Sequence, residues 1–411
     1  MKLMGYRRAN GSFGIRKYVA VLPSVFCANH AAQKIAERVN SLIAAPEHSS
    51  EFAPGHLDGC IGLPHQLGCG QHGKDLDQTV RTLIGLGCNP NIGAVLLVGL
   101  GCERVSVQEL YDGIAPTGKP VRTIVIQECG GTDKTIEKGV EIASELAAEL
   151  AKQEREAFDE SKLLVGLKCG GTDALSGIAA NPALGLAVDR LIDGGGSAML
   201  TEIGELVGAE HLLAKRGINE EVAKRIREII LHTEEVQLRM TEGYEKTGSR
   251  AALVTPGNFE GGVTTVSEKA LGGILKSGHR PFVGTLEYSE RPDLDANPGL
   301  YLMNAEGQDG EVVTPMAAAG AQIVCFTSGR GTPTGFPFVP VIKITGNDHT
   351  FHNMEGDIDI NAGTFVTGEK TLAEVGDEIY GMIEAVANGM QTKPERGGHC
   401  ELFTIGRYEM Y

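Results

Sequence analysis

The sequence predicts an α/β protein made of two doubly wound, mainly parallel βαβ regions. Short apolar runs, such as residues 94–100 and 163–167, stop in polar turns that are rich in glycine. Each turn leads into a segment whose apolar residues have helical spacing, an alternation typical of a parallel sheet with helical crossovers. Glycine is also abundant, at 56 of the 411 residues, which suits a chain with many tight βα turns.

The first predicted domain covers residues 1–156 and has a Rossmann-like order of elements. After a turn at 11–14, an apolar strand at 18–22 stops at Pro23. Apolar residues at 31, 35, 39 and 42 predict a helix over 30–43. The pattern continues with strands at 58–63, 94–100 and 121–126, and with helices at 74–86 and 132–156. The charged stretch 154–162 marks the predicted boundary.

The second predicted domain, residues 157–411, repeats this alternation. The strand candidates are 163–167, 197–202, 281–288, 299–303, 321–326 and 341–344. Helices are expected at 183–192, 219–243 and 266–277, with a Gly-rich loop at 248–265. A last helix at 372–388 has clear limits, because Thr371 can cap its start and Gly389 its end.

The charge balance excludes some classes of partner. Acidic residues outnumber basic ones by 53 to 37, for a formal net charge of −16. An acidic surface argues against nucleic acid or an anionic membrane as the main partner. No apolar run approaches the ~20 residues of a membrane helix, and glycines at 11 and 14 interrupt the start of the chain where a signal peptide would need an apolar segment. We expect a cytoplasmic protein.

The turns after four strands carry the chemistry. The string CGGTD occurs at 129–133 and again at 169–173, each time after an apolar run. Residues 94–104 and 322–335 are two more such runs, which end in Gly with Cys or Arg. Ligands bind to open α/β sheets at the carboxyl ends of the strands. We therefore expect these loops to share one edge, although each could be a tight turn whose glycines serve only the backbone.

Cysteine and histidine in these turns suggest a metal site. Nine cysteines in 411 residues are too few for a disulfide scaffold. The loop His65-x3-Cys69-x2-His72 could offer several ligands to one metal, or be a polar turn with solvated histidines. Cys102 with Glu103, and Cys169, add donors from two further loops. Three cysteines could ligate an iron–sulfur cluster in which one iron is left free to bind substrate. A single Fe(II) with mixed ligands is the alternative, and the spacing of the residues does not distinguish between the two.

Arginines form a second group of candidates. Arg16 follows a Gly-rich turn, and Arg330 lies among glycines and hydroxyls with Thr332, as binding of a carboxylate or phosphate requires. Glu202 follows a strand and could reach the same edge as a base. Neither the P-loop spacing nor a GxGxxG fingerprint is present, which disfavours a nucleotide cofactor.

Several long motifs resemble one enzyme family. They include GYRRANGSFGIRKYVAVLPSV at 5–25, GLKCGGTDALSGIAANPALG at 166–185, FTSGRGTPTG at 326–335 and DIDINAG at 357–363. Together with shorter matches they cover nearly the whole chain, which resembles the large-subunit form of the altronate/galactarate dehydratase family. The loop PHQLGCGQ at 64–71 is most similar to that of the family's sulfolactate sulfo-lyase large subunits.

The resemblance implies a metal-dependent lyase that removes water or sulfite from the β-carbon of a 2-hydroxy acid. It implies Fe²⁺ as the usual metal and a separate small partner subunit of the SAF type. We expect a homo-oligomer with the active site between the two regions. In this hypothesis Cys69, Cys102, Cys169 and Glu103 hold the iron, and His65 or Glu202 takes the proton. His72 protonates the leaving group, while the remaining candidates bind substrate: Arg16, Arg330, Thr332, Asp173 and Asn181.

Two other classes of function stay open at this point. One is a redox or metal-storage protein built on the cysteines. The other is a non-catalytic, iron-binding large subunit that scaffolds its small partner.

Overall fold

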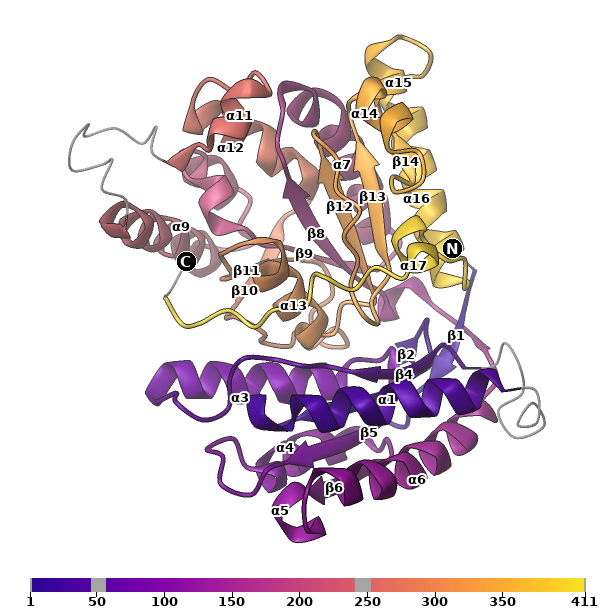
Figure 1. The fold of residues 1–411 in the computed structure, drawn as a ribbon. Helices are drawn as coiled ribbons and strands as arrows, with labels where there is room; N and C mark the ends of the chain where they lie inside the picture. The colour runs from indigo at the N-terminus through magenta and orange to yellow at the C-terminus, as the bar shows by residue number, and fades with distance from the viewer. Residues whose placement is uncertain (1, 46–56, 241–252, 410–411) are drawn as a thin grey trace.

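The computed structural model describes residues 2–45, 57–240 and 253–409. Two parallel sheets and their helices form two stacked regions (Figure 1). One sheet has four strands in the order β4-β3-β5-β6, and the other has seven in the order β10-β11-β9-β8-β12-β13-β14. All pairs in both sheets are parallel, and helices cover their faces, so the predicted doubly wound α/β class is confirmed.

The first region follows the predicted order closely. Its strands are β3 (Tyr18–Pro23), β4 (Gly59–Gly62), β5 (Ile92–Gly99) and β6 (Val121–Val125). Its helices are α1 (Asn29–Ala44), α3 (Gly73–Cys88), α4 (Val107–Ile114), α5 (Ile126–Cys129) and α6 (Thr132–Ala151). Every residue of β5 is buried, because α1 and α6 pack on one face of the sheet and α3 and α4 on the other.

The second region is built around the seven-stranded sheet. The strands are β8 (Leu164–Gly170), β9 (Ser197–Leu200), β10 (Phe282–Leu286), β11 (Leu300–Met303), β12 (Ile323–Ser328), β13 (Val341–Thr345) and β14 (Ile360–Asn361). The longer helices are α7 (Asn181–Asp193), α9 (Glu220–Met240), α12 (Val266–Ile274), α13 (Asp309–Ala319) and α16 (Leu372–Ala387). Short helices complete it: α8 (Glu210–Ala214), α11 (Pro256–Glu260), α14 (Asp348–Asn353), α15 (Gly363–Val366) and α17 (Lys393–Gly397).

One hydrophobic core joins the two regions. Helix α13 covers the face of the large sheet that looks toward the first region, and it packs against α3 (Figure 1). A Cβ atom on Gly85 would lie 2.4 Å from the carbonyl oxygen of Ala318, so glycine lets these helices approach closely. The other face of the large sheet packs against α7, α9, α12 and α16.

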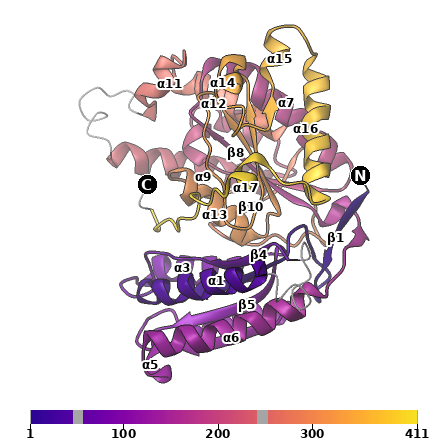
Figure 2. The ribbon, with the colours of Figure 1, turned by 45° about the vertical axis from the view of Figure 1, so that its right-hand side comes forward.

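A small antiparallel sheet also links the regions, and the sequence did not indicate it. Strand β1 (Leu3–Arg7) pairs with β2 (Phe13–Gly14) and with β7 (Glu156–Phe158). Strand β7 occupies the charged stretch that we read as a linker, because the stacked rings of Phe158 and Phe13 anchor it. Figure 2 shows β1 beside the end of the chain's long α16 helix.

Smaller differences concern the ends of elements. The long helix expected over 132–156 stops at Ala151. The start of the expected loop at 248–265 and the end of the expected helix at 219–243 lie outside the described residues. Among the residues that are described, no helix is long and apolar enough to cross a membrane.

Candidate active site

The expectation of one shared edge is wrong. The loops with Cys69, Cys102 and Cys129 follow strands of the four-stranded sheet, whereas Cys169 and Arg330 follow strands of the seven-stranded sheet. The candidate residues therefore lie at two edges of two different sheets.

At the first edge, both ring nitrogens of His65 make hydrogen-bond contacts with the main chain around its loop. Its side chain is buried, Nε2 lies 2.8 Å from the carbonyl oxygen of Pro23, and Nδ1 accepts a hydrogen bond from the Leu67 amide at 3.2 Å. Burial lowers the pKa of His65 to about 4, which favours the neutral ring. Both nitrogens are engaged, so the geometry assigns His65 a loop-holding role instead of the expected proton transfer.

Glu103 is committed in the same way. Its carboxylate accepts hydrogen bonds from Ser24 Oγ at 2.7 Å and from the amides of residues 100, 101 and 102. Burial would raise the pKa of Glu103, but these hydrogen bonds outweigh burial and lower the pKa. Cys69 and Cys102 are exposed on adjoining loops, since the Gly68 carbonyl accepts from the amides of residues 104 and 105. His72 is exposed at the start of α3.

The second edge holds a buried cluster of charges. Lys168 Nζ, at the end of β8, lies 2.9 Å from Glu202 Oε1 and 2.5 Å from Asp309 Oδ1. Lys276 Nζ lies 3.4 Å from Glu202 Oε2 and 3.0 Å from Cys169 Sγ. The amide of Cys169 also donates to Glu202 Oε2 at 2.7 Å. Both lysines are fully buried, and isolated buried charges of this kind are costly unless they are paired.

Glu202 is the centre of this cluster and has an unusual backbone. Its φ is 60°, a left-handed conformation that residues other than glycine rarely adopt. Burial alone would raise the pKa of Glu202, but Lys168 and Lys276 lower it, so the carboxylate is favoured. Backbone strain at a buried ionised residue is characteristic of functional sites.

A third lysine in the cluster differs from the other two. Lys343 on β13 and Lys168 on β8 both align with Phe326 of β12, and their Nζ atoms lie 3.6 and 4.2 Å from its ring centroid. Lys343 Nζ donates to Thr334 Oγ1 at 3.2 Å, and no ion pair with a carboxylate is found for it in the described part of the chain. Burial, and to a lesser extent Lys168, lowers its pKa well below the ordinary lysine value. A lowered pKa favours the neutral amine, which is the form that can accept a proton.

The sequence did not single out Lys276, Lys343 or Asp309. The one signal for Lys343 was its position within an apolar run, Val341–Thr345, where a lysine on a buried strand needs a reason. Lys276 and Asp309 lie next to helix ends, where charged residues are usual, so no pattern marked them.

Some of the expected substrate-binding side chains are accessible to a ligand, and others are bound to neighbouring protein groups. Arg330 is about half exposed at 53%, and its contact with Glu260 is a long 3.3 Å. Thr332 bonds to Thr334 at 2.9 Å and lies near the lysines. By contrast, Asp173 accepts from the amide and hydroxyl of Ser176, both at 2.7 Å.

Asn181 and Arg16 have structural roles. Asn181 is fully buried, accepts from Thr327 Oγ1 at 2.7 Å and donates to the Gly272 carbonyl at 3.0 Å. Arg16 is 2% exposed and binds Glu395 with two hydrogen bonds of 2.7 and 2.8 Å. It also donates to main-chain carbonyls near the end of α16, so it ties the two regions together where a substrate contact had been expected.

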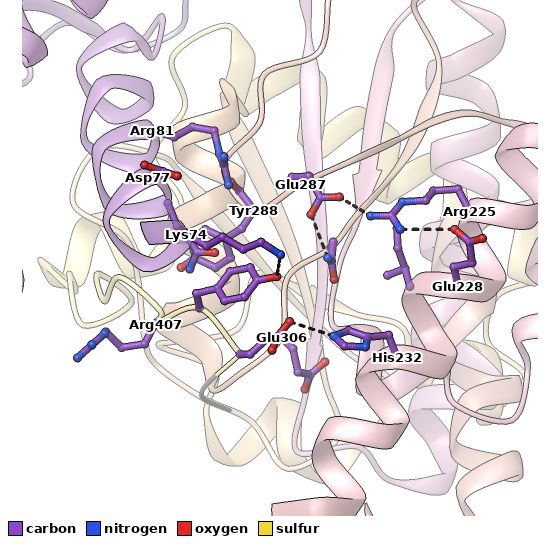
Figure 3. Close-up of a pocket in the computed structure, with 15 residues that line it drawn as sticks. Lys74, Asp77, Arg81, Arg225, Glu228, His232, Glu287, Tyr288, Glu306 and Arg407 are labelled. Atoms are coloured by element: carbon purple, nitrogen blue, oxygen red, sulfur yellow. Dashed lines mark hydrogen bonds and ion pairs between the residues drawn. The ribbon is translucent and has the colours of Figure 1, made fainter. Parts of the chain in front are cut away.

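A cavity of about 500 Å³ lies between the two regions (Figure 3). Its walls come from α3, α9, the loops after β10 and β11, and the C-terminal segment 407–409. Lys74 on α3 donates to Tyr408, and Arg225 on α9 pairs with Glu287 at 2.5 Å. Glu306 also lines this cavity, and burial, with Glu205 and Glu202 nearby, raises its pKa to about 7.

The expected iron ligands do not fit a metal in this arrangement. Within residues 2–45, 57–240 and 253–409, no three His, Cys, Asp or Glu side chains are placed to hold an ion. Cys169 follows a strand of the other sheet from the loops that carry Cys69 and Cys102. No step proposed here therefore depends on iron.

A buried glutamate with a strained backbone and two buried lysine partners, at the carboxyl edge of a parallel sheet, is characteristic of an enzyme active site. Comparison with known proteins agrees. Residues 160–410 match the family model described as D-galactarate/Altronate dehydratase, C-terminal. Residues 5–151 match D-galactarate dehydratase/Altronate hydrolase, second domain.

Curated relatives extend this match over almost the whole chain. The (2R)-sulfolactate sulfo-lyase subunit beta of Chromohalobacter salexigens is 37% identical and covers 99% of this chain and 97% of its own. The altronate dehydratase of Bacillus subtilis is 36% identical, with coverage of 97% and 76%. The galactarate dehydratase (L-threo-forming) of Escherichia coli is 35% identical, with coverage of 94% and 72%.

The chain belongs to the D-galactarate/altronate dehydratase family, and it is a lyase. The expected family is confirmed, and the relatives give no support to a non-catalytic scaffold.

Proposed function

We propose that this lyase eliminates water or sulfite from the β-carbon of a 2-hydroxy acid, either a sugar acid or sulfolactate. The names of the relatives support these two substrate classes. The proposed chemistry rests on the environment of Lys343. This buried amine is hydrogen-bonded to the hydroxyl of Thr334, and the lysine near it, Lys168, is paired with two carboxylates.

The reaction begins with loss of the proton from the α-carbon. Lys343 takes this proton, because burial and Lys168 favour its neutral amine. The electron pair of the broken C–H bond would place negative charge on the substrate carboxylate. Lys168 and Arg330 border the position where that charge develops, and fixed cations at such a position stabilise the transition state.

The bond from the β-carbon to the leaving group then breaks, and its electrons leave with the hydroxyl or the sulfite. The remaining enol takes up a proton on the β-carbon and becomes a 2-oxo acid. Glu202 keeps Lys168 and Lys276 charged and in place, so its role is to position the cations.

We place the substrate's entry at the cavity of Figure 3, because its lining includes Glu306, whose charge is close enough to interact with that of Glu202. A pocket of a few hundred cubic ångströms is the usual size for a small-molecule site. Charged groups of both signs in its walls suit a ligand that carries a carboxylate and several hydroxyls.

A small SAF-type subunit is a further proposal for this chain. The printed name of the sulfo-lyase relative, subunit beta, supports a multi-subunit enzyme. Metal analysis of anaerobically purified protein tests for iron, and co-purification with a small subunit tests for the partner.

The central test is turnover by the purified protein of a panel of 2-hydroxy acids, with sulfolactate and six-carbon sugar acids included. Formation of a 2-oxo acid together with water or sulfite supports the proposal. Lack of turnover with every member, with and without Fe²⁺ and the small subunit, refutes it.

A further inference from the structure

The C-terminal segment brings a histidine and a glutamate to the buried lysines. Residues after α17 run back along the large sheet, and the Leu402 amide donates to the Gly335 carbonyl at 2.9 Å. His399 Nδ1 lies 2.7 Å from Glu401 Oε1, and Glu401 Oε2 accepts from the Gly335 amide at 3.3 Å. This pair is therefore fixed beside Gly335.

Gly335 is the neighbour of Thr334, which is the hydroxyl partner of Lys343. A Cβ atom at position 335 would lie 3.1 Å from His399 Cβ and 2.5 Å from the His399 carbonyl oxygen. Glycine thus lets the histidine pack directly against the segment that holds the lysine. The charge of Glu401 is also close enough to act on Lys343.

The pairing leaves one ring nitrogen of His399 for chemistry. A carboxylate that accepts from Nδ1–H fixes the ring and its tautomer, and Nε2 is then the nitrogen that exchanges a proton. Hydrogen bonds hold the pKa of Glu401 below its usual value although burial opposes them, so the carboxylate form is favoured. The His399 side chain is 28% exposed, and it lies beside Gly335, the neighbour of Thr334.

The two candidate leaving groups differ in their need for an acid. Hydroxide is a strong base, and its departure from carbon is slow unless it leaves as water. Sulfite is a much weaker base and can leave without a proton. A fixed histidine–carboxylate pair therefore has a function in loss of water and none in loss of sulfite.

We propose that His399 is a catalytic acid which donates its Nε2 proton to the β-hydroxyl of a 2,3-dihydroxy acid, with Glu401 as its positioning residue. This inference rests on the proposed function and narrows it to dehydration. Lys343 takes the α-proton, the C–O bond breaks, and its electron pair leaves on the oxygen as water. The imidazole is left neutral, Lys343 is left protonated, and both exchange protons with solvent after the product departs.

The test compares two leaving groups on the same variants. The full-length protein is assayed with a 2,3-dihydroxy acid and with its 3-chloro-2-hydroxy analogue, because chloride needs no proton. H399N should lower kcat for the hydroxyl substrate by about 10²–10⁴-fold, the usual contribution of an acid, and change kcat for the chloro analogue less than about 10-fold. E401Q should show the same selectivity to a smaller extent.

H279N is the matched control, because His279 also pairs with a carboxylate, Asp189, at 2.8 Å, on an exposed surface. It should leave both rates unchanged. Equal losses on both substrates in H399N would mean a structural role, and no loss on either would mean no role; both results overturn the inference. Wild-type turnover of sulfolactate alone overturns it while the proposed function stands, and no turnover at all refutes the proposed function.

Discussion

Replacing Lys343 by methionine separates the proposed base from the ion-paired lysine beside it. Lys343 makes one side-chain hydrogen bond, to Thr334, and otherwise packs on Phe326. Methionine has a similar length and keeps the apolar contact, so K343M should cost less than about 1.5 kcal/mol of stability. Loss of a general base should lower kcat by about 10²–10⁴-fold.

K168M provides the contrast. It removes the ammonium group that pairs with Glu202 and Asp309, and it leaves the buried carboxylate of Glu202 without this partner. Breaking a buried pair by removal of one member costs about 3–5 kcal/mol. K168M should therefore lower the thermal unfolding midpoint strongly, whereas K343M should not.

The pH dependence gives an independent check. Because burial lowers the pKa of Lys343, the unfolded state binds a proton at this amine more tightly than the folded state, which favours unfolding at pH values below the ordinary lysine pKa. That effect disappears above the ordinary lysine pKa of about 10.4. K343M lacks it, so its stability relative to wild type should be greater at pH 7 than at pH 10.5.

The assays are steady-state kinetics and unfolding midpoints at both pH values. A K343M enzyme with wild-type kcat, or one as unstable as K168M, would contradict the assignment.

Three further outcomes test the roles of other side chains. R16M should lower the free energy of unfolding by about 3–5 kcal/mol, the cost of a broken buried pair, and leave KM unchanged. A higher KM with normal stability would restore Arg16 to the substrate site. Wild-type protein should lose about 3 kcal/mol of stability as the pH falls from about 6.5 to 4, because His65 binds a proton in the unfolded state over this range while the buried ring of the folded state stays neutral. H65Q should lack this loss when unfolding is measured across the same range. A maleimide should label Cys69 and Cys102 in the folded protein and Cys169 only after unfolding, as peptide mapping would show, and fast labelling of Cys169 would contradict its burial.

The local pattern predicted most elements of the fold. The apolar run at 163–167 is β8, and the helix expected at 372–388 is α16, which begins at the predicted cap, Thr371. Strand β7 was missed because it gains its stability from pairing with β1, a contact that spans most of the first region. Local composition reports the periodicity of one element and carries no information on such a distant partner.

The candidate site was predicted in part. Cys169 and Glu202 do meet at one strand edge, and Arg330 and Thr332 lie on loops of the same sheet. Of the two expected arginines, Arg16 is buried and paired with Glu395, and of the two expected bases, His65 is buried and hydrogen-bonded within its own surroundings. A sequence shows which side chains can carry out chemistry, but it does not show which of them already have all their hydrogen bonds.

By itself, the sequence determined the α/β class, the family and the kind of residue at each strand end, because these depend on local periodicity and on motifs. Only the tertiary structure decided that the strands form two sheets, that Lys168 and Lys276 pair with Glu202, and that Lys343 and Lys168 share contact with Phe326. The physical reason is that the charge state of a buried lysine depends on its neighbours. Those neighbours come from strands and helices far apart in the chain, and packing alone brings them together.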